Sequence, residues 1–171
     1  MLKNITRKKQ SYLLAISVFT ILLLGILTFT VYAEEDLIVG HAKVIDGDTI
    51  DINGERIRLA YIDAPETKQQ CFKQKVEYNC GLFSKDTLTK LAEIGEFKCV
   101  KLKLDIYKRV LGECFLFDIN INKFMVRSGN AILYRNIKIY QESQIAAENE
   151  AVGIWGYDFQ EPWLWRKAKK S

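Results

Sequence analysis

The sequence predicts an α+β domain in residues 34–171, in which five short strands form a small closed barrel and three helices are added. Three observations predict this class. Five short segments are rich in alternating apolar residues, two pairs of these segments are joined by tight turns, and three other segments carry apolar residues at helical spacing. A closed barrel is the natural way to bury five short strands without exposed edges.

An N-terminal hydrophobic helix is predicted before this domain, within residues 1–33. Basic residues near the start are followed by an uncharged stretch, residues 12–33, that is long enough to span a membrane. Val31-Tyr32-Ala33 suits cleavage by a signal peptidase, whereas the length of the apolar run suits an uncleaved anchor. Both alternatives stay open, and both place residues 34–171 outside the cytoplasm. The domain would be membrane-anchored, or periplasmic or secreted after cleavage near Ala33.

The strands are predicted from the alternation of apolar residues and from turn signals. Asn53-Gly54 is the strongest short hairpin signal, and Asp105–Lys108 forms a second turn. The predicted strands are residues 37–45, 49–52, 55–62, 97–104 and 110–119.

The helices are predicted from apolar residues at helical spacing. Gly129 is expected to stop the second helix, and Gly153 followed by Ile154 suits a left-handed C-terminal cap of the third. Between strands and helices, residues 67–79 are polar and loop-like. The predicted helices are residues 81–94, 122–130 and 141–152, and the tail FQEPWLWRKAKK places two tryptophans before a basic end.

Four cysteines lie in the part predicted to be exported, and an even number there indicates two disulfides. Cys71 and Cys80 share one polar stretch, whereas Cys99 and Cys114 lie on two predicted strands. A four-cysteine zinc site is the alternative. It requires closely spaced cysteine pairs, and separations of nine and fifteen residues do not supply them.

The second hairpin predicts which cysteines pair. If Leu104 faces Arg109 across the turn, Cys99 lies directly opposite Cys114, within bridging distance. The other two cysteines then form the second disulfide.

The net charge of +4 gives no argument for a nucleic-acid partner. Four of the 25 basic residues and none of the acidic ones lie before residue 34, which leaves 21 basic and 21 acidic residues in the domain. A nucleic acid would therefore have to be bound by a local patch.

Two acidic motifs, IDGDTI and IDAPET, place oxygen ligands where they could converge. Asp48, Asp63 and the carbonyl of Ala64, which the next proline holds in an extended conformation, would form a hard-oxygen site suited to Ca²⁺. The alternative is structural, because Asp-Gly is common in turns and Asp-Ala-Pro-Glu can simply end a strand. The single histidine, His41, lies on the first strand without a nucleophile motif nearby and is interpreted as structural.

The first hairpin brings the two motifs together. In ideal register Asp48 faces Leu59 and lies beside Arg58. Strict alternation would point the side chains of Asp48 and Arg58 to opposite faces. Either a bulge intervenes, or Asp48 sits in the turn before the ladder begins.

Two arginines could hold a phosphate. Arg58 opens the second motif and Arg109 closes the second turn, and an arginine fork can bind two phosphate oxygens at once. With a divalent cation they would stabilise charge on a pentacoordinate phosphorus. Glu66 could orient or deprotonate water, and Tyr107 could contact a nucleotide. The alternative for Arg109 is an exposed hairpin arginine.

With these residues assembled, the chain resembles the staphylococcal nuclease-like (thermonuclease) family, and its cysteines and PWLWR tail resemble a cysteine-bearing bacterial branch. The resemblance covers roughly residues 42–155. It rests on motifs in the family's order: VIDGDTI at 44–50, RLAYIDAPET at 58–67, DIYKRVLG at 105–112, MVRSGNA at 125–131 and GIW at 153–155.

The resemblance implies a five-stranded OB-fold barrel with three helices, and Ca²⁺-dependent endonucleolytic cleavage of DNA and RNA that leaves 3′-phosphates. By motif, Asp48, Asp63 and Ala64 resemble metal ligands, Glu66 the residue that activates water, Arg58 and Arg109 phosphate clamps, and Tyr107 and Tyr134 nucleotide contacts. Ala64 replaces a threonine of the secreted prototype and Ile106 a lysine, and the alignment shifts slightly after Ala131. These departures concern substrate preference more than chemistry.

Two other functions are weighed against this one. A non-catalytic OB-fold module tethered at the membrane would bind nucleic acid, and a disulfide-stabilised surface module would contact proteins. The complete set of acids and arginines favours the enzyme, because a module that only binds does not need it. We expect a monomer that uses DNA and RNA as substrates and is held at the membrane through residues 12–33 if these are not cleaved.

Overall fold

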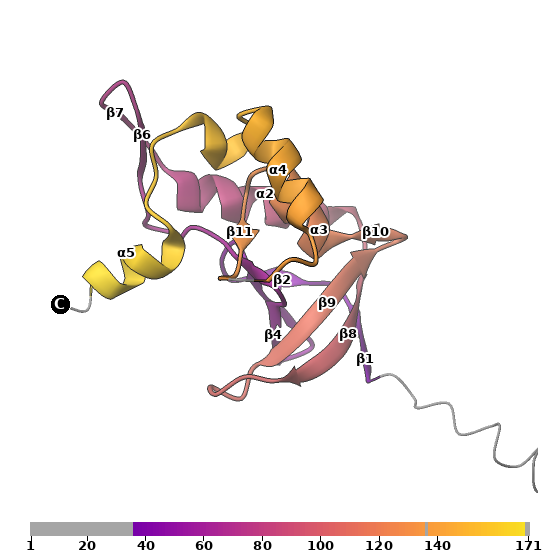
Figure 1. The fold of residues 1–171 in the computed structure, drawn as a ribbon. Coiled ribbons are helices and arrows are strands. Elements are labelled where there is room, and N and C mark those ends of the chain that lie inside the picture. Colours follow the sequence, from indigo (N-terminus) through magenta and orange to yellow (C-terminus); the bar gives the residue numbers. More distant parts are fainter. Residues whose placement is uncertain (1–35, 136, 170–171) are drawn as a thin grey trace, which may run out of the picture. The chain divides into compact units, whose positions relative to one another are not determined.

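The computed structural model describes residues 36–135 and 137–169. A curled sheet and a group of helices at one end of it give the mixed α+β class that was predicted (Figure 1). The strands are β1 (Leu37–Gly40), β2 (Lys43–Val44), β3 (Thr49–Ile52), β4 (Glu55–Leu59), β5 (Ile62–Asp63), β6 (Cys71–Lys73), β7 (Val76–Tyr78), β8 (Phe97–Leu104), β9 (Val110–Leu116), β10 (Ile119–Asn120) and β11 (Ile132–Leu133). The helices are α2 (Cys80–Ile94), α3 (Ile121–Arg127), α4 (Gln141–Asn149), the 3-10 helix η1 (Gly153–Gly156) and α5 (Pro162–Ala168).

The main sheet has the strand order β1-β8-β9-β4-β3-β2, with β10 paired to β9. The predicted first strand, residues 37–45, is divided into β1 and β2, which form the two edges of this sheet. The sheet is therefore a curled half-barrel whose edges are linked by the chain at His41–Ala42, rather than the closed five-stranded ring that we predicted. The side chain of Asn53 bridges toward the other edge by donating to the Val39 carbonyl at 3.3 Å.

The first hairpin has the predicted register. Ile52 pairs with Glu55 across Asn53-Gly54, and both turn residues have positive φ, 55° and 87°. Two consecutive residues with positive φ are characteristic of a type I′ turn, whose twist matches that of the strands it joins.

The second hairpin confirms the Cys99–Cys114 disulfide, although the turn differs from the prediction. Cys99 lies directly opposite Cys114 and is bonded to it. Leu104, however, pairs with Val110 and not with Arg109, and a bulge between Lys101 and Lys103 restores the register. A bulge adds one residue to one strand only, so it compensates for the turn.

The predicted strand 55–62 ends early. β4 stops at Leu59, Tyr61 has a φ of 72°, and Ile62 then begins the separate strand β5. β5 pairs with β11 in a two-stranded sheet of its own. The positive φ of Tyr61 redirects the chain, so that the side chains before and after it no longer alternate as in one straight strand.

Three of the helices occur where they were predicted, and their ends differ. α3 stops at Arg127, followed by Gly129 with a φ of 66°. α4 ends at Asn149, three residues before the predicted end. Its left-handed cap is Ala151, because the amides of Ala151 and Val152 donate to the carbonyls of Glu148 and Ala147 in the pattern of a Schellman motif.

Gly153 does not cap α4, and its positive φ of 57° has another cause. A Cβ on Gly153 would lie 2.2 Å from the carbonyl oxygen of Gly129, so the two glycines allow two backbone segments to touch. The amide of Ile154 donates to that same carbonyl at 2.9 Å. This contact joins the end of α3 to η1.

Several elements were not predicted: the β6–β7 hairpin, β11, η1 and α5. The polar stretch 67–79 contains the β6–β7 hairpin, in which Cys71 pairs with Tyr78, and Cys71 is bonded to Cys80 at the start of α2 as expected. α5 is a fourth α-helix in the described residues, begun by Pro162 at a position where proline needs no hydrogen-bond partner.

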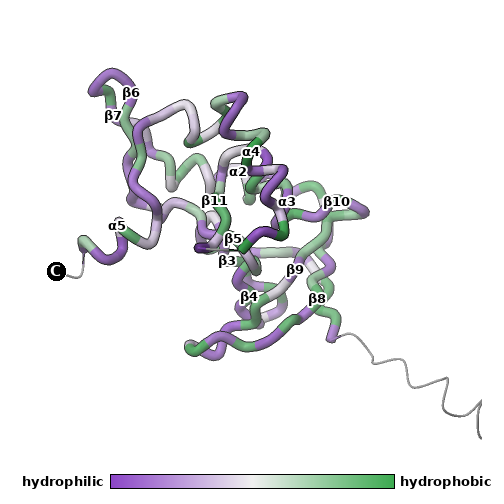
Figure 2. The backbone as a smooth tube through the Cα atoms, in the orientation of Figure 1, coloured by the Kyte–Doolittle hydropathy of each residue, from purple (hydrophilic) through white to green (hydrophobic). Residues whose placement is uncertain are grey.

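The core lies between the sheet and the helices, where apolar segments of both face each other (Figure 2). Its fully buried side chains include Ile50, Ile57, Leu59, Leu88 and Phe97. This core fixes β3, β4 and α2 against one another. A second cluster, of Cys71, Cys80, Ile132 and Ile154, joins β6 and α2 to β11 and η1.

The predicted hydrophobic helix and the cleavage site at Ala33 lie outside the described residues. Within residues 36–135 and 137–169, no helix has the length and apolar character needed to cross a membrane.

Candidate active site

Asp48 lies in the bend between β2 and β3 and is only 3% exposed. The bend packs tightly on α2, because a Cβ on Gly47 would lie 2.1 Å from the hydroxyl of Ser84. The amide of Asp48 donates to the side chain of Asp46 at 3.0 Å. Asp46 therefore shapes the bend that holds Asp48 in place.

Arg58 joins the two acidic motifs. Its Nη1 donates to Oδ1 of Asp48 at 2.6 Å, and its Nη2 donates to Oδ1 of Asp63 at 2.8 Å. Asp48 precedes the first ladder pair, Thr49 with Arg58, so the second of our two alternatives holds and the side chain of Asp48 is free of strand alternation. Asp63 reaches Arg58 because the chain turns at Tyr61.

The backbone of the second motif also holds Asp48. The amide of Ala64 donates to Oδ2 of Asp48 at 3.0 Å, and the hydroxyl of Thr49 donates to Oδ1 at 3.1 Å. Both oxygens of Asp48 are thus engaged by groups of this chain.

Burial and charge oppose each other in this cluster. Burial raises the pKa of Asp48 to about 7, against the lowering effect of Arg58. For Arg58, burial favours a lower pKa, but the carboxylates of Asp48 and Asp63 more than offset it and raise the pKa. The ion pairs therefore hold the arginine charged, while Asp48 carries the cost of burial.

Arg166 is a second arginine in this cluster, and it comes from α5. Its Nη1 donates to Oδ1 of Asp63 and to Oε1 of Glu66, both at 2.9 Å, and its Nη2 donates to Oδ2 of Asp63 at 2.9 Å. Burial favours a lower pKa of Arg166, but these hydrogen bonds raise it. Asp63 is 1% exposed, whereas a third of the Glu66 side chain is open to solvent.

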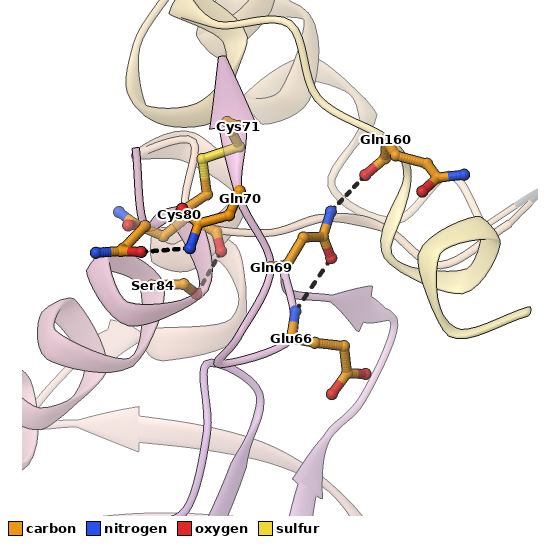
Figure 3. The surroundings of a disulfide bond; sticks show 9 residues. Glu66, Gln69, Gln70, Cys71, Cys80, Ser84 and Gln160 are labelled. Carbon is orange, nitrogen blue, oxygen red and sulfur yellow. Dashed lines mark hydrogen bonds between the residues drawn. A yellow bond between two sulfur atoms is a disulfide. The ribbon is translucent and has the colours of Figure 1, made fainter. Parts of the chain in front are cut away.

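A buried glutamine fixes the backbone of Glu66. Gln69 is fully buried, its Oε1 accepts from the amide of Glu66 at 3.2 Å, and its Nε2 donates to the carbonyl of Gln160 at 2.6 Å (Figure 3). A Cβ on Gly81, at the start of α2, would lie 1.7 Å from the carbonyl oxygen of Glu66. The Glu66 side chain points away from the adjacent disulfide (Figure 3).

Arg109 and Tyr107 lie on the turn between β8 and β9. Arg109 Nε donates to Asp105 at 2.8 Å, and its guanidinium lies 5.5 Å from the centre of the Tyr107 ring. Tyr107 is 69% exposed. Although burial works the other way, the hydrogen bonds from Arg109 lower the pKa of Asp105.

Arg109 is bonded to Asp105 rather than to the Arg58 cluster, and it directly precedes β9, the strand that pairs with the strand of Arg58. β4 and β9 are parallel, with Arg58 opposite Leu111. Arg109 is two residues before Leu111, so alternation puts it on the face that carries Arg58. The site residues thus divide into a cluster and a neighbouring turn.

Tyr134 directly follows β11. Its amide donates to the carbonyl of Tyr61 at 2.9 Å, and the guanidinium of Arg135 lies 5.0 Å from the centre of its ring. Because β11 pairs with β5, Tyr134 lies beside the strand that carries Asp63.

The donor set suits a hard cation. One guanidinium reaches Asp48 and Asp63 together, so the two carboxylates face one point. Carboxylate and carbonyl oxygens are the ligands that Ca²⁺ prefers, and water can complete its shell. Among residues 36–135 and 137–169 no group of three His, Cys, Asp or Glu side chains is placed to hold a metal, so a cation here would depend on two carboxylates, a backbone oxygen and water.

Sequence reasoning missed Arg166 and Gln69. Arg166 is 103 residues from Asp63, and the basic tail in which it lies resembles an ordinary solvated end of a chain. The one available signal was the proline-started PWLWR segment, which has the features of a short helix. Gln69 lies in a polar stretch, and nothing in its surroundings there indicates that it is buried.

Comparison with known proteins identifies a family and several relatives that this chain matches. The family model for "Staphylococcal nuclease homologue" matches residues 56–157. The succinoglycan biosynthesis protein ExoI of Rhizobium meliloti is 38% identical over 123 residues, which cover 69% of this chain and 64% of that protein.

Two further relatives carry nuclease names. An uncharacterized endonuclease of Escherichia coli is 34% identical over 136 residues, covering 74% of this chain and 83% of that protein. The micrococcal nuclease of Shigella flexneri is 32% identical over 149 residues, covering 75% and 80%.

Proposed function

Since the chain belongs to the staphylococcal nuclease family, we propose that it is a Ca²⁺-dependent nuclease that hydrolyses phosphodiester bonds of DNA and RNA outside the cytoplasm. The observation that carries the proposal is the convergence of Asp48, Asp63 and Glu66 around two guanidinium groups. Three acids and two arginines in one cluster are more than a binding surface requires.

The metal ligands in this proposal are the carboxylates of Asp48 and Asp63 and the carbonyl of Ala64. A bound Ca²⁺ would supply positive charge to the scissile phosphate and its leaving oxygen. The protein holds Asp48 in place through hydrogen bonds from Ala64 and Thr49, and Asp63 through a hydrogen bond from Arg58. Both carboxylates are almost fully buried, which strengthens their attraction for a cation.

Glu66 is the general base in this proposal. It is the most exposed of the three acids, so water can reach its carboxylate. Glu66 would take a proton from the attacking water as the new P–O bond forms. The bond to the 5′ oxygen would break, and this oxygen would take a proton from water, which leaves a 3′-phosphate and a 5′-hydroxyl. Gln69 fixes the backbone from which Glu66 acts.

Arg58 and Arg109 would bind the non-bridging phosphate oxygens. Both are at least partly exposed, with 16% and 26% of their side chains open. Arg109 would exchange its bond to Asp105 for a phosphate oxygen, and Tyr107 beside it is exposed enough to contact a nucleotide. Tyr134 is proposed as a second nucleotide contact.

The location is also part of the proposal. Two disulfides suit an oxidising compartment, and the basic and hydrophobic segments before residue 34 suit export with or without an anchor. We propose a monomer. Cell fractionation followed by mass measurement of the purified protein would test export and cleavage near Ala33.

The function is tested by incubating the purified chain with plasmid DNA and with RNA, in calcium and in excess chelator. Cleavage of either polymer in calcium alone, with 3′-phosphate ends, is the expected result. Retention of the polymers without cleavage would indicate the binding module instead, and neither binding nor cleavage would contradict both functions.

A further inference from the structure

α5 lies beyond residues 56–157, the region matched by the family model, yet it supplies a guanidinium to the candidate active site. Arg166 engages both oxygens of Asp63 and one oxygen of Glu66. Paired hydrogen bonds between a guanidinium and a carboxylate fix both distance and direction, so Arg166 sets the position of Glu66 relative to Asp63.

Few side chains of α5 are buried. Pro162 is its one buried residue, and Trp163 is 38% exposed. The interactions that tie this segment to the domain include the ion pairs of Arg166 and, just before the helix, the bond from Gln69 to Gln160. Because the ion pairs of Arg166 end on Asp63 and Glu66, a change at these two acids acts directly on α5.

A cation bound at this site and Arg166 would both contact the carboxylate of Asp63. The cluster holds three acids (Asp48, Asp63 and Glu66) and two arginines (Arg58 and Arg166), so it carries one negative charge when all are ionised. Without Arg166 it would carry two. A divalent cation bound to Asp63 meets the positive charge of Arg166 at short range, and this repulsion lowers the affinity of the site for the cation.

We propose that α5 is a working part of the active site, in which Arg166 positions Glu66 and competes with the divalent cation for Asp63. Cation binding and the docking of α5 are therefore antagonistic. The inference rests on the proposed Ca²⁺-dependent function, and it assigns to the C-terminal helix a role in setting both cation affinity and turnover.

The test compares the full-length chain, solubilised in detergent, with Arg166→Gln, Arg166→Lys and the control Arg127→Gln. Arg127 makes a paired contact with Glu150, at 2.7 and 2.8 Å, at an exposed site. Calorimetry gives the Kd for Ca²⁺, and steady-state cleavage gives kcat and KM. Circular dichroism establishes that each variant is folded.

We expect Arg166→Gln to bind Ca²⁺ on the order of tenfold more tightly, since a nearby positive charge is removed. We expect its kcat to fall on the order of 10- to 100-fold, since Glu66 loses its position. Arg166→Lys keeps the charge but not the fork, so its Kd should stay near that of the wild type while kcat remains low. Arg127→Gln should change neither quantity.

An unchanged or weaker affinity for Ca²⁺ in folded Arg166→Gln would overturn the competition, even if the wild type is an active nuclease. If the wild type itself neither binds Ca²⁺ nor cleaves, the proposed function fails and the inference fails with it.

A second measurement uses the wild type alone and needs no variant. Trp163 and Trp165 lie on α5, so saturating Ca²⁺ should change the tryptophan emission of the wild type, and an unchanged emission would count against the antagonism.

Discussion

Replacing Asp48 by asparagine should change how the stability of the protein depends on pH. Burial raises the pKa of Asp48 from 3.8 to about 7 in the folded protein. Between these values the folded state holds a proton that the unfolded state has lost. The free energy of unfolding therefore falls as pH rises through this window, and the stability that protonated Asp48 contributes is lost above pH 7.

The magnitude follows from the size of the shift. A change from 3.8 to about 7 corresponds to at most about 4 kcal/mol. An asparagine side chain does not ionise, so Asp48→Asn should be relieved of this penalty. Its unfolding free energy, minus that of the wild type, should increase by about 2–4 kcal/mol between pH 4 and pH 8. The asparagine oxygen can still accept a hydrogen bond from Arg58, so the variant keeps this contact without a charge that titrates.

The assay is urea unfolding at several pH values, with excess chelator and intact disulfides, followed by circular dichroism. Asp118→Asn provides the control, because Asp118 is exposed in the connection between β9 and β10. This control should keep the pH dependence of the wild type. Parallel stability curves for the wild type and Asp48→Asn would refute the reasoning, because they would mean that Asp48 ionises as easily in the folded as in the unfolded chain.

Three further predictions concern other parts of the molecule. Arg109→Lys should reduce kcat/KM by at least about tenfold, because lysine keeps the charge and loses the two-pronged contact with phosphate; wild-type cleavage rates would remove Arg109 from the mechanism. Replacing Cys99 and Cys114 together by alanine should lower the unfolding free energy by about 3 kcal/mol, as expected for a disulfide spanning 15 residues; chemical denaturation measures it, and an unchanged midpoint would contradict it. Gly81→Ala should reduce both stability and kcat, because the new methyl group would lie 1.7 Å from the carbonyl oxygen of Glu66; a fully active, equally stable variant would show that this loop yields freely.

Local signals predicted the hairpins well. Asn53-Gly54 favours a two-residue type I′ turn, and this turn sets the register of the two strands. The pairing that places Asp48 beside Arg58 could therefore be derived from the sequence. Cys99 and Cys114 were paired correctly although the turn was wrong, because a bulge compensated for it. A bulge has no reliable sequence signal when both strands alternate smoothly.

Features that depend on distant contacts could not be predicted. The strand 55–62 shows no break in its alternation, yet it turns at Tyr61, where the carbonyl of Tyr61 accepts from the amide of Tyr134. The first strand, residues 37–45, divides because its halves pair with different strands at opposite edges of the sheet. In both places tertiary pairing overrides the local pattern.

The sequence predicted that three acids and one arginine of the candidate site would lie together. Asp48, Arg58, Asp63 and Glu66 could be assembled because they lie within one hairpin and the turn after it. Arg166 could not, because no local rule connects a residue in a C-terminal helix to a carboxylate 103 residues away.

The most direct test of the account measures calcium-dependent cleavage of nucleic acid by the wild type and by Glu66→Gln, with the Kd for Ca²⁺ measured on both proteins. Glutamine keeps the size of the side chain and an oxygen that can accept from Arg166, but it cannot take a proton from water. The account predicts that the variant folds and binds Ca²⁺, while its kcat falls on the order of 100-fold or more. A kcat near that of the wild type in folded, calcium-binding Glu66→Gln would contradict the central claim that Glu66 activates water at this site.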